Sequence, residues 1–91
     1  MKFRISRHSS SAPPVDAIDL LWARLGPRHE ETVFAKIGNE IRATWGESRA
    51  SSARDERAER GREEVLEIIT TVCDRSPELK ADWYAVSFIS A

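Results

Sequence analysis

Hydrophobic and polar positions divide the chain into segments of two different periods. Residues 2 to 6, KFRIS, alternate polar and apolar with Phe3 and Ile5 on one side, which predicts a short half-buried strand. Between residues 15 and 25 apolar residues instead recur every three or four positions, as on one face of a helix. They are Val15, Ile18, Leu21, Trp22 and Leu25. Gly26 follows and is expected to end this helix, because glycine readily takes the positive φ of a helix cap.

A second helical pattern follows the polar residues 47 to 57, in which Ser52 and Asp55 resemble a capping box. Its apolar stripe consists of Ala58, Gly61, Val65, Ile68, Ile69 and Val72, with Leu66 and Cys73 beside it. Charged residues occupy most of the opposite side, as on a solvated helix face. Pro77 disfavours helical geometry in the residue before it, so we expect the helix to end near Asp74.

The segment WYAVSFIS, residues 83 to 90, is rich in aromatic and β-branched residues and is therefore predicted to be a strand. One side of this strand carries Trp83, Ala85, Ser87 and Ile89, and the other carries Tyr84, Val86 and Phe88. Apolar groups on both sides indicate that both are covered, either by the fold itself or by a partner chain.

Residues 33 to 46, VFAKIGNEIRATWG, fit two structures. As a helix they present one stripe, made of Val33, Ile37, Ile41 and Trp45. A glycine in the middle of a helix costs about 1 kcal/mol relative to alanine, however, and the β-branched residues favour strands. We therefore predict a hairpin around Gly38 and Asn39, the residues best suited to a tight turn. Its expected pairs are Ile37 with Ile41, Ala35 with Ala43, and Val33 with Trp45, which leaves Phe34 out of pattern.

The predicted order is strand, helix, strand, strand, helix, strand. An α+β chain of this order and size most often folds as a ferredoxin-like two-layer sandwich, in which a four-stranded antiparallel sheet carries two helices on one face. Residues 1 to 91 are expected to form a single domain. The other face of the sheet would then be open.

Composition and charge reduce the number of functions that fit the sequence. The chain has 91 residues, and its 14 basic and 15 acidic residues give a net charge of -1. It therefore has no general attraction to nucleic acids or anionic membranes. No apolar run is long enough to span a bilayer, and the N-terminus lacks the apolar region of a signal peptide. We expect a cytoplasmic protein. So small a chain has a thin core, which favours a homodimer.

Candidate catalytic chemistry is sparse. Cys73 is the only cysteine, so no disulfide or cysteine-based zinc spacing occurs within the chain. His29 precedes two glutamates in the segment PRHEE, which could form an acid–base or metal cluster but is more simply a solvated turn. No cofactor, metal or catalytic set is predicted.

The open face of the predicted sheet is the main candidate site. Four side chains are expected to face a partner or ligand there: Phe34, Tyr84, Val86 and Phe88. The favoured hypothesis is a non-catalytic module that acts by forming a homodimer or by binding a protein partner. One alternative is a small cofactor-independent enzyme or ligand-binding protein, with His29, Arg42 and Tyr84 as polar candidates. Another is binding of single-stranded nucleic acid by the basic N-terminal strand; this is less favoured because no RNA-recognition motif is present.

In the nucleic-acid hypothesis the basic groups are Lys2, Arg4 and Arg7, which precede any acidic residue in the chain.

Overall fold

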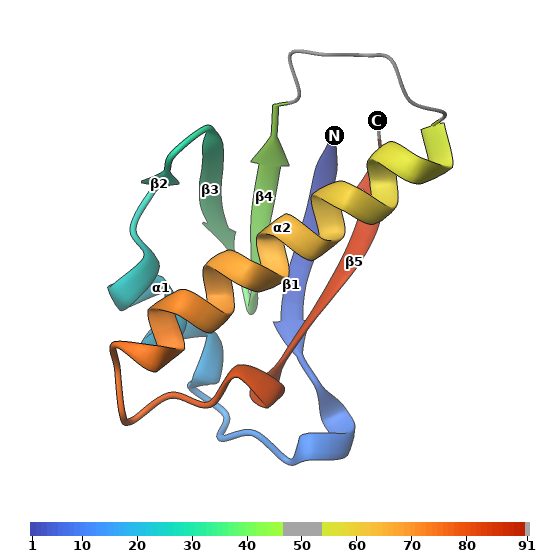
Figure 1. The fold of residues 1–91 in the computed structure, drawn as a ribbon. Helices are drawn as coiled ribbons and strands as arrows, with labels where there is room; N and C mark the ends of the chain where they lie inside the picture. Colours follow the sequence, from blue (N-terminus) through green and yellow to red (C-terminus); the bar gives the residue numbers. More distant parts are fainter. Residues whose placement is uncertain (47–53, 91) are drawn as a thin grey trace.

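One antiparallel sheet and two helices make up the fold, and a computed structural model describes residues 1–46 and 54–90 of it (Figure 1). The strands and helices, with two short 3-10 helices, are β1 (Lys2–Arg7), η1 (Ser9–Ser11), α1 (Ala17–Leu25), β2 (Arg28–His29), β3 (Thr32–Ile37), β4 (Glu40–Trp45), α2 (Arg54–Asp74), η2 (Ala81–Trp83) and β5 (Tyr84–Ser90). The five strands lie in the order β2-β3-β4-β1-β5, and every neighbouring pair is antiparallel. The protein is thus an α+β protein, as predicted.

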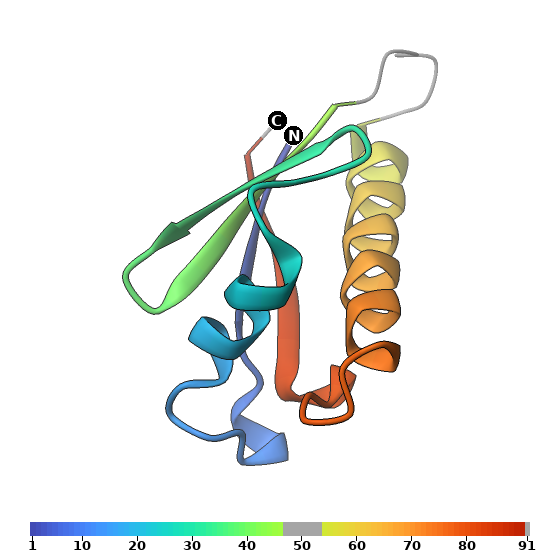
Figure 2. The same cartoon turned by 90° about the vertical axis from the view of Figure 1, so that its left-hand side faces the viewer.

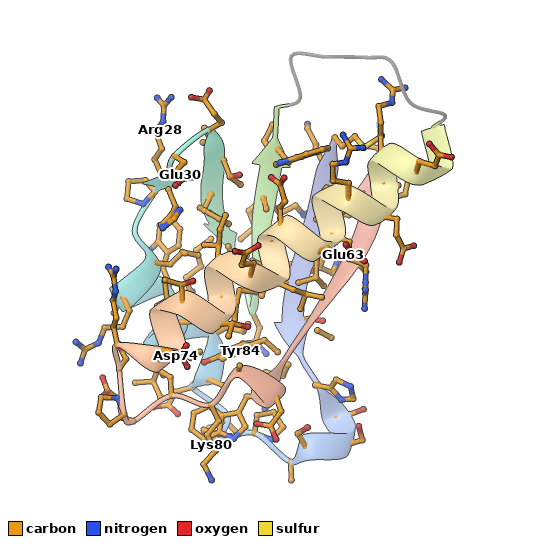
Figure 3. All side chains as sticks on the ribbon, in the orientation of Figure 1. Arg28, Glu30, Glu63, Asp74, Lys80 and Tyr84 are labelled. Atoms are coloured by element: carbon orange, nitrogen blue, oxygen red, sulfur yellow. The ribbon has the colours of Figure 1, made fainter. Side chains whose placement is uncertain are left out.

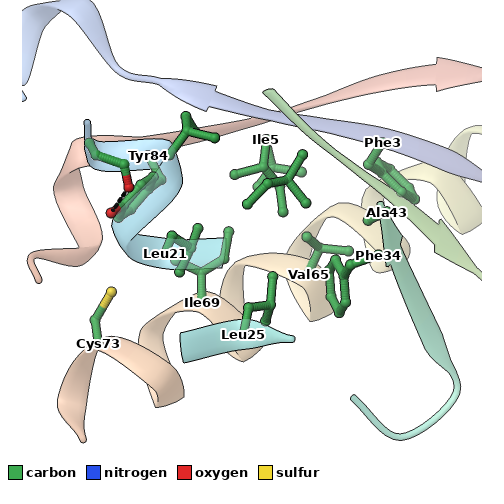
Figure 4. Packing of buried hydrophobic residues seen from close by; sticks show 14 of the residues in the cluster. Phe3, Ile5, Leu21, Leu25, Phe34, Ala43, Val65, Ile69, Cys73 and Tyr84 are labelled. Carbon is green, nitrogen blue, oxygen red and sulfur yellow. Dashed lines mark hydrogen bonds between the residues drawn. The ribbon is translucent and has the colours of Figure 1, made fainter. Parts of the chain in front are cut away.

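Both helices pack on the same face of the sheet, and the core lies between the two layers (Figures 2 and 4). Alternate residues of each strand point into this core, as the period-two pattern of KFRIS predicts for Phe3 and Ile5, which are both fully buried. The buried cluster consists of Phe3, Ile5, Ala17, Ile18, Leu21, Leu25, Phe34, Ile41, Ala43, Trp45, Val65, Ile69, Cys73, Leu79, Tyr84 and Val86.

The predicted number of four strands is wrong, because the sheet has five. Arg28 and His29 form β2, which pairs with Val33 and Thr32 at the start of β3. Glu30 has a φ of +53° and closes the reversal between the two strands. A strand of two residues has no periodicity, so the hydrophobic pattern could not reveal it.

The predicted hairpin at residues 33 to 46 is confirmed, but its predicted register is wrong. Ile37 pairs with Glu40 and Phe34 with Ala43, so the loop has two residues and not three. Gly38 has a φ of +61° and Asn39 has no positive φ, the combination found in a type II′ hairpin turn. A shift of one residue moves every side chain of a strand to the other face.

The two predicted helices are confirmed. The stripe of α1 is buried from Ala17 to Leu25, although Val15 lies before the helix and is 82% exposed. Gly26 has a φ of +74°, and its N–H donates to the Trp22 carbonyl at 3.1 Å. The second helix ends at Asp74 as expected; the predicted cap at Ser52 lies outside the described residues. None of the helices that the structure describes is both long and apolar enough to cross a membrane.

Gly61 lies where α2 packs tightly against the sheet. A Cβ atom at this position would lie 2.7 Å from Cζ of Phe3 and 2.7 Å from Cε3 of Trp45. Real side chains do not come so close, so only glycine lets the helix lie at this height above β1 and β4.

We therefore expect Gly61→Ala to destabilise the protein. Overpacking a buried contact costs roughly 1–3 kcal/mol, and the better helix propensity of alanine offsets about 1 kcal/mol of it. The free energy of unfolding, measured with urea, should fall by up to about 2 kcal/mol. Gly46→Ala is the control, because a Cβ there meets no atom within 4 Å. A Gly61→Ala variant more stable than the original chain would contradict the close packing.

Candidate interaction surfaces

Among the described strands, β5 forms the longest edge of the sheet that pairs with no further strand. Of the described strands only β1 pairs with β5, and the other edge of the sheet is the two-residue β2. The seven residues of β5, YAVSFIS, include no charged residue and no proline. Charges, prolines and very short strands are the devices by which proteins prevent such edges from pairing with other chains.

The direction of the β5 backbone follows from its register with β1. Arg7 lies opposite Tyr84, so the next pair along β1 is His8 and Trp83. The His8 N–H donates to the Trp83 carbonyl at 2.6 Å, so the Trp83 carbonyl points toward β1. Backbone groups alternate in direction along an antiparallel strand. The N–H groups of Val86 and Phe88 therefore point away from β1, toward the outside of the sheet.

One backbone carbonyl on this edge accepts a hydrogen bond from a side chain of α2. Nε of Arg62, on α2, donates to the Val86 carbonyl at 3.0 Å. Arg62 thus covers one acceptor of the edge at the buried Val86, whereas Phe88 further along the strand is 40% exposed. No feature of the sequence pattern indicated this contact, since Arg62 lies on the charged side of the helix stripe.

Phe88 is the one apolar candidate that stays accessible. It is 40% exposed and packs edge-on against Phe3, with ring centroids 5.8 Å apart. Because Phe88 lies directly opposite the buried Phe3, its side chain is on the helix-bearing face of the sheet, near the end of β5.

The other three apolar candidates lie in the core, not on the open face. Phe34, Tyr84 and Val86 are each at most 3% exposed and belong to the buried cluster; Figure 4 shows Phe34 and Tyr84 among the core side chains. The expected row of large apolar side chains on the open face of β5 is therefore wrong. Ala85 and Ser87 of β5 lie on that face instead.

Tyr84 joins the last strand to the start of α1. Its hydroxyl donates to the Ala17 carbonyl at 2.7 Å, and burial raises the pKa of the phenol. Burial likewise raises the pKa of the Cys73 thiol, with a smaller contribution from the charge of Asp74. Neither group is poised to ionise near neutral pH, which fits a packing role.

The open face of the sheet carries charged residues at its centre. Arg4 on β1 lies directly opposite Arg42 on β4, and one carboxylate oxygen of Glu40 accepts hydrogen bonds from both, at 3.1 Å and 2.7 Å respectively. The hydrogen bond from Arg42, the larger cause, and the one from Arg4 lower the pKa of Glu40. Arg42, a polar candidate in the sequence, is thus held in an ionic cluster.

An apolar strip lies beside this cluster on β3. Val33 and Ile37 are 47% and 51% exposed, with Ala35 between them on the same face. They lie there because of the one-residue change in hairpin register. The open face is therefore mixed in character, with no aromatic side chain among the described residues that point to it.

A groove of about 580 Å³ separates the β2–β3 hairpin from α2. Its lining includes His29, Trp45 and Glu64, and the Trp45 indole N–H donates to Glu64 at 2.8 Å. Nδ1 of His29 is buried without a hydrogen-bond partner. Among residues 1–46 and 54–90, no three His, Cys, Asp or Glu side chains are arranged to hold a metal ion.

The three polar candidates of the enzyme hypothesis do not meet. His29 lies in the groove at the β2 end of the sheet, between Arg28 and Glu30, while Tyr84 lies below α2 near the start of β5 (Figure 3). Arg42 points to the open face, on the other side of the sheet from both. The geometry therefore provides no common centre for a reaction.

Comparisons with family models, with curated proteins and with solved structures find no significant match. The function must be inferred from the surfaces themselves.

The Glu40 cluster gives a prediction for pH dependence. A carboxylate whose pKa is lowered in the folded state adds stability above its unfolded pKa, and this is lost as the pH falls through the folded pKa. Arg42→Gln removes the largest cause of the shift, so the NMR titration midpoint of the Glu40 carboxyl should rise toward the ordinary value of 4.5. Arg28→Gln, which makes the same change in charge elsewhere, should leave it in place. An unchanged midpoint in Arg42→Gln would refute the assignment.

Proposed function

We propose that this protein is a non-catalytic α+β module that acts by homodimerisation, with β5 of one copy pairing to β5 of a second. The observation that carries the proposal is the uncharged seven-residue outer strand, with the N–H groups of Val86 and Phe88 directed away from the sheet. Strand addition uses these main-chain groups for affinity.

A second copy is the partner that fits this edge best. Antiparallel pairing of a strand with itself places like residues near each other across the two-fold axis. In a charged strand this brings equal charges together, whereas β5 has no charged residue of its own. The half-exposed Phe88 would be covered at the same junction.

Arg62 is compatible with this pairing. A carbonyl oxygen has two lone pairs and accepts two hydrogen bonds, so the Val86 oxygen can keep the Arg62 bond while a second strand donates to it. The pairing would join two sheets into one and place both α2 helices on the same side of it.

We further propose that the domain is a variant of the ferredoxin-like sandwich. The order β3-β4-β1-β5 of antiparallel strands, with α1 after β1 and α2 after β4, supports this assignment. In that interpretation β2 is an addition to the edge beside β3. The cytoplasmic location expected from the sequence stays a prediction.

Ser87→Glu tests the edge without disturbing the core. Ser87 is exposed and lies opposite Arg4, so a glutamate there has a basic neighbour within one copy, but two copies bring their glutamates together across the junction. We expect a dimer for the original chain by light scattering, and a dimer dissociation constant at least about tenfold higher for Ser87→Glu, since like charges across an interface are destabilising.

Thr44→Glu is the matched control. Thr44 is exposed and lies opposite Lys2 on the open face of an inner strand, so it receives the same change away from the edge. The proposal expects its dimer to be unaffected. Dissociation by Thr44→Glu but not by Ser87→Glu would assign the dimer to the open face instead, and a monomer over about a hundredfold dilution would remove the proposal.

A further inference from the structure

A small cavity of about 390 Å³ lies at the end of the sheet where β1 finishes. Three parts of the chain meet there: the end of β1, the turn of the β3–β4 hairpin, and the loop through η1 (Figure 1). The residues that line it are Ser6, Arg7, Ser9, Ala12, Pro13 and Asn39. This volume is within the range of small-ligand sites, roughly 300–1,000 Å³.

The loop that forms one wall is fixed by its own backbone. The His8 N–H is bonded to the Trp83 carbonyl, and the Ala12 N–H donates to the Ser9 carbonyl at 3.3 Å. Ala12 has a φ of +47°, a conformation that residues other than glycine seldom adopt. These bonds fix the backbone on both sides of Ser9 before any ligand arrives, which lowers the entropy lost on binding.

The polar groups of the lining all can donate hydrogen bonds, and only Arg7 is charged. Arg7 carries a guanidinium, Ser6 and Ser9 carry hydroxyls, and Asn39 carries an amide, while no carboxylate is among the lining residues. Arg7 has no acidic partner in the part of the chain that the structure describes, in contrast to Arg4 and Arg42, which share Glu40. A guanidinium with free N–H groups is suited to bidentate binding of an oxyanion.

We infer that this cavity is a binding site for a phosphate group, free or carried by a small molecule. The lining residues come from three segments, with the Arg7 guanidinium as the charged group, and donors from several segments fit the tetrahedral oxygens of phosphate better than the planar pair of a carboxylate. The inference is independent of the β5 edge, because none of the lining residues belongs to β5.

Calorimetric titration with inorganic phosphate at constant ionic strength tests the site. The protein should bind phosphate at one site per chain, and Arg7→Gln should raise the dissociation constant roughly tenfold or more, as expected for the loss of charge-assisted hydrogen bonds. Arg75→Gln is the matched control. Arg75 is exposed and likewise has no ion pair among the described residues, and its substitution changes the net charge by the same amount at another place.

The Arg7→Lys variant distinguishes the contribution of the planar guanidinium from that of the positive charge. It keeps the positive charge and loses the planar fork, so we expect binding weaker than in the original chain and stronger than in Arg7→Gln. Equal weakening by Arg7→Gln and Arg75→Gln would show unspecific attraction and overturn the assignment. Absence of binding by the original chain, or acetate binding as well as phosphate, would also overturn it. Circular dichroism of each variant checks that the fold is kept.

Discussion

The two-residue turn at Gly38 and Asn39 determines which side of the β3–β4 hairpin faces the helices. With a loop of this length Phe34 stands beside Ala43 on the core side, where it is 2% exposed. A loop one residue longer would carry Phe34 to the open face, and leaving such a side chain in water costs roughly 1.5–3 kcal/mol. The same turn puts Val33 and Ile37 on the open face. Core and surface of the hairpin thus follow from one backbone conformation, which Gly38 makes possible by its positive φ.

The elements themselves could be predicted from the sequence, because each has its own period. The alternation in KFRIS and the spacing of three and four residues in the helices correspond directly to the buried faces of β1, α1 and α2. The register of the hairpin could not be predicted in this way, since Gly-Asn and Gly-Asn-Glu both form turns and the apolar pattern tolerates either. The two residues of β2 were too few to show a pattern.

The candidate surfaces were harder to predict than the fold. Tyr84, Val86 and Phe88 were correctly placed on one side of the last strand, but the pattern could not say that this side faces the helices. The cluster of Arg4, Glu40 and Arg42 joins two strands, so it appears only when their register is known. Arg62 reaches the edge of the sheet from the polar side of α2, where a charged residue is normally interpreted as solvated.

Two different physical features support the two functional inferences. The proposed dimer depends on the lack of charged residues in the outer strand β5, which permits this strand to pair with a copy of itself. At the end of β1 it is the opposite feature, an arginine without an acidic partner among the described residues, placed in a cavity lined by further donors. Arg4 is neutralised in part by Glu40, so the nucleic-acid hypothesis loses one of its three basic groups, Lys2, Arg4 and Arg7.

The central claim is that the outer edge of β5 pairs with another copy, and amide hydrogen exchange measured by NMR at two protein concentrations tests it most directly. The account predicts that the Val86 and Phe88 amides exchange slowly at high concentration and rapidly after dilution, because only a second strand protects them. The Ser87 amide, which faces β1, should be protected at both concentrations. Rapid exchange of Val86 and Phe88 at every concentration, with Ser87 still protected, would contradict pairing at this edge.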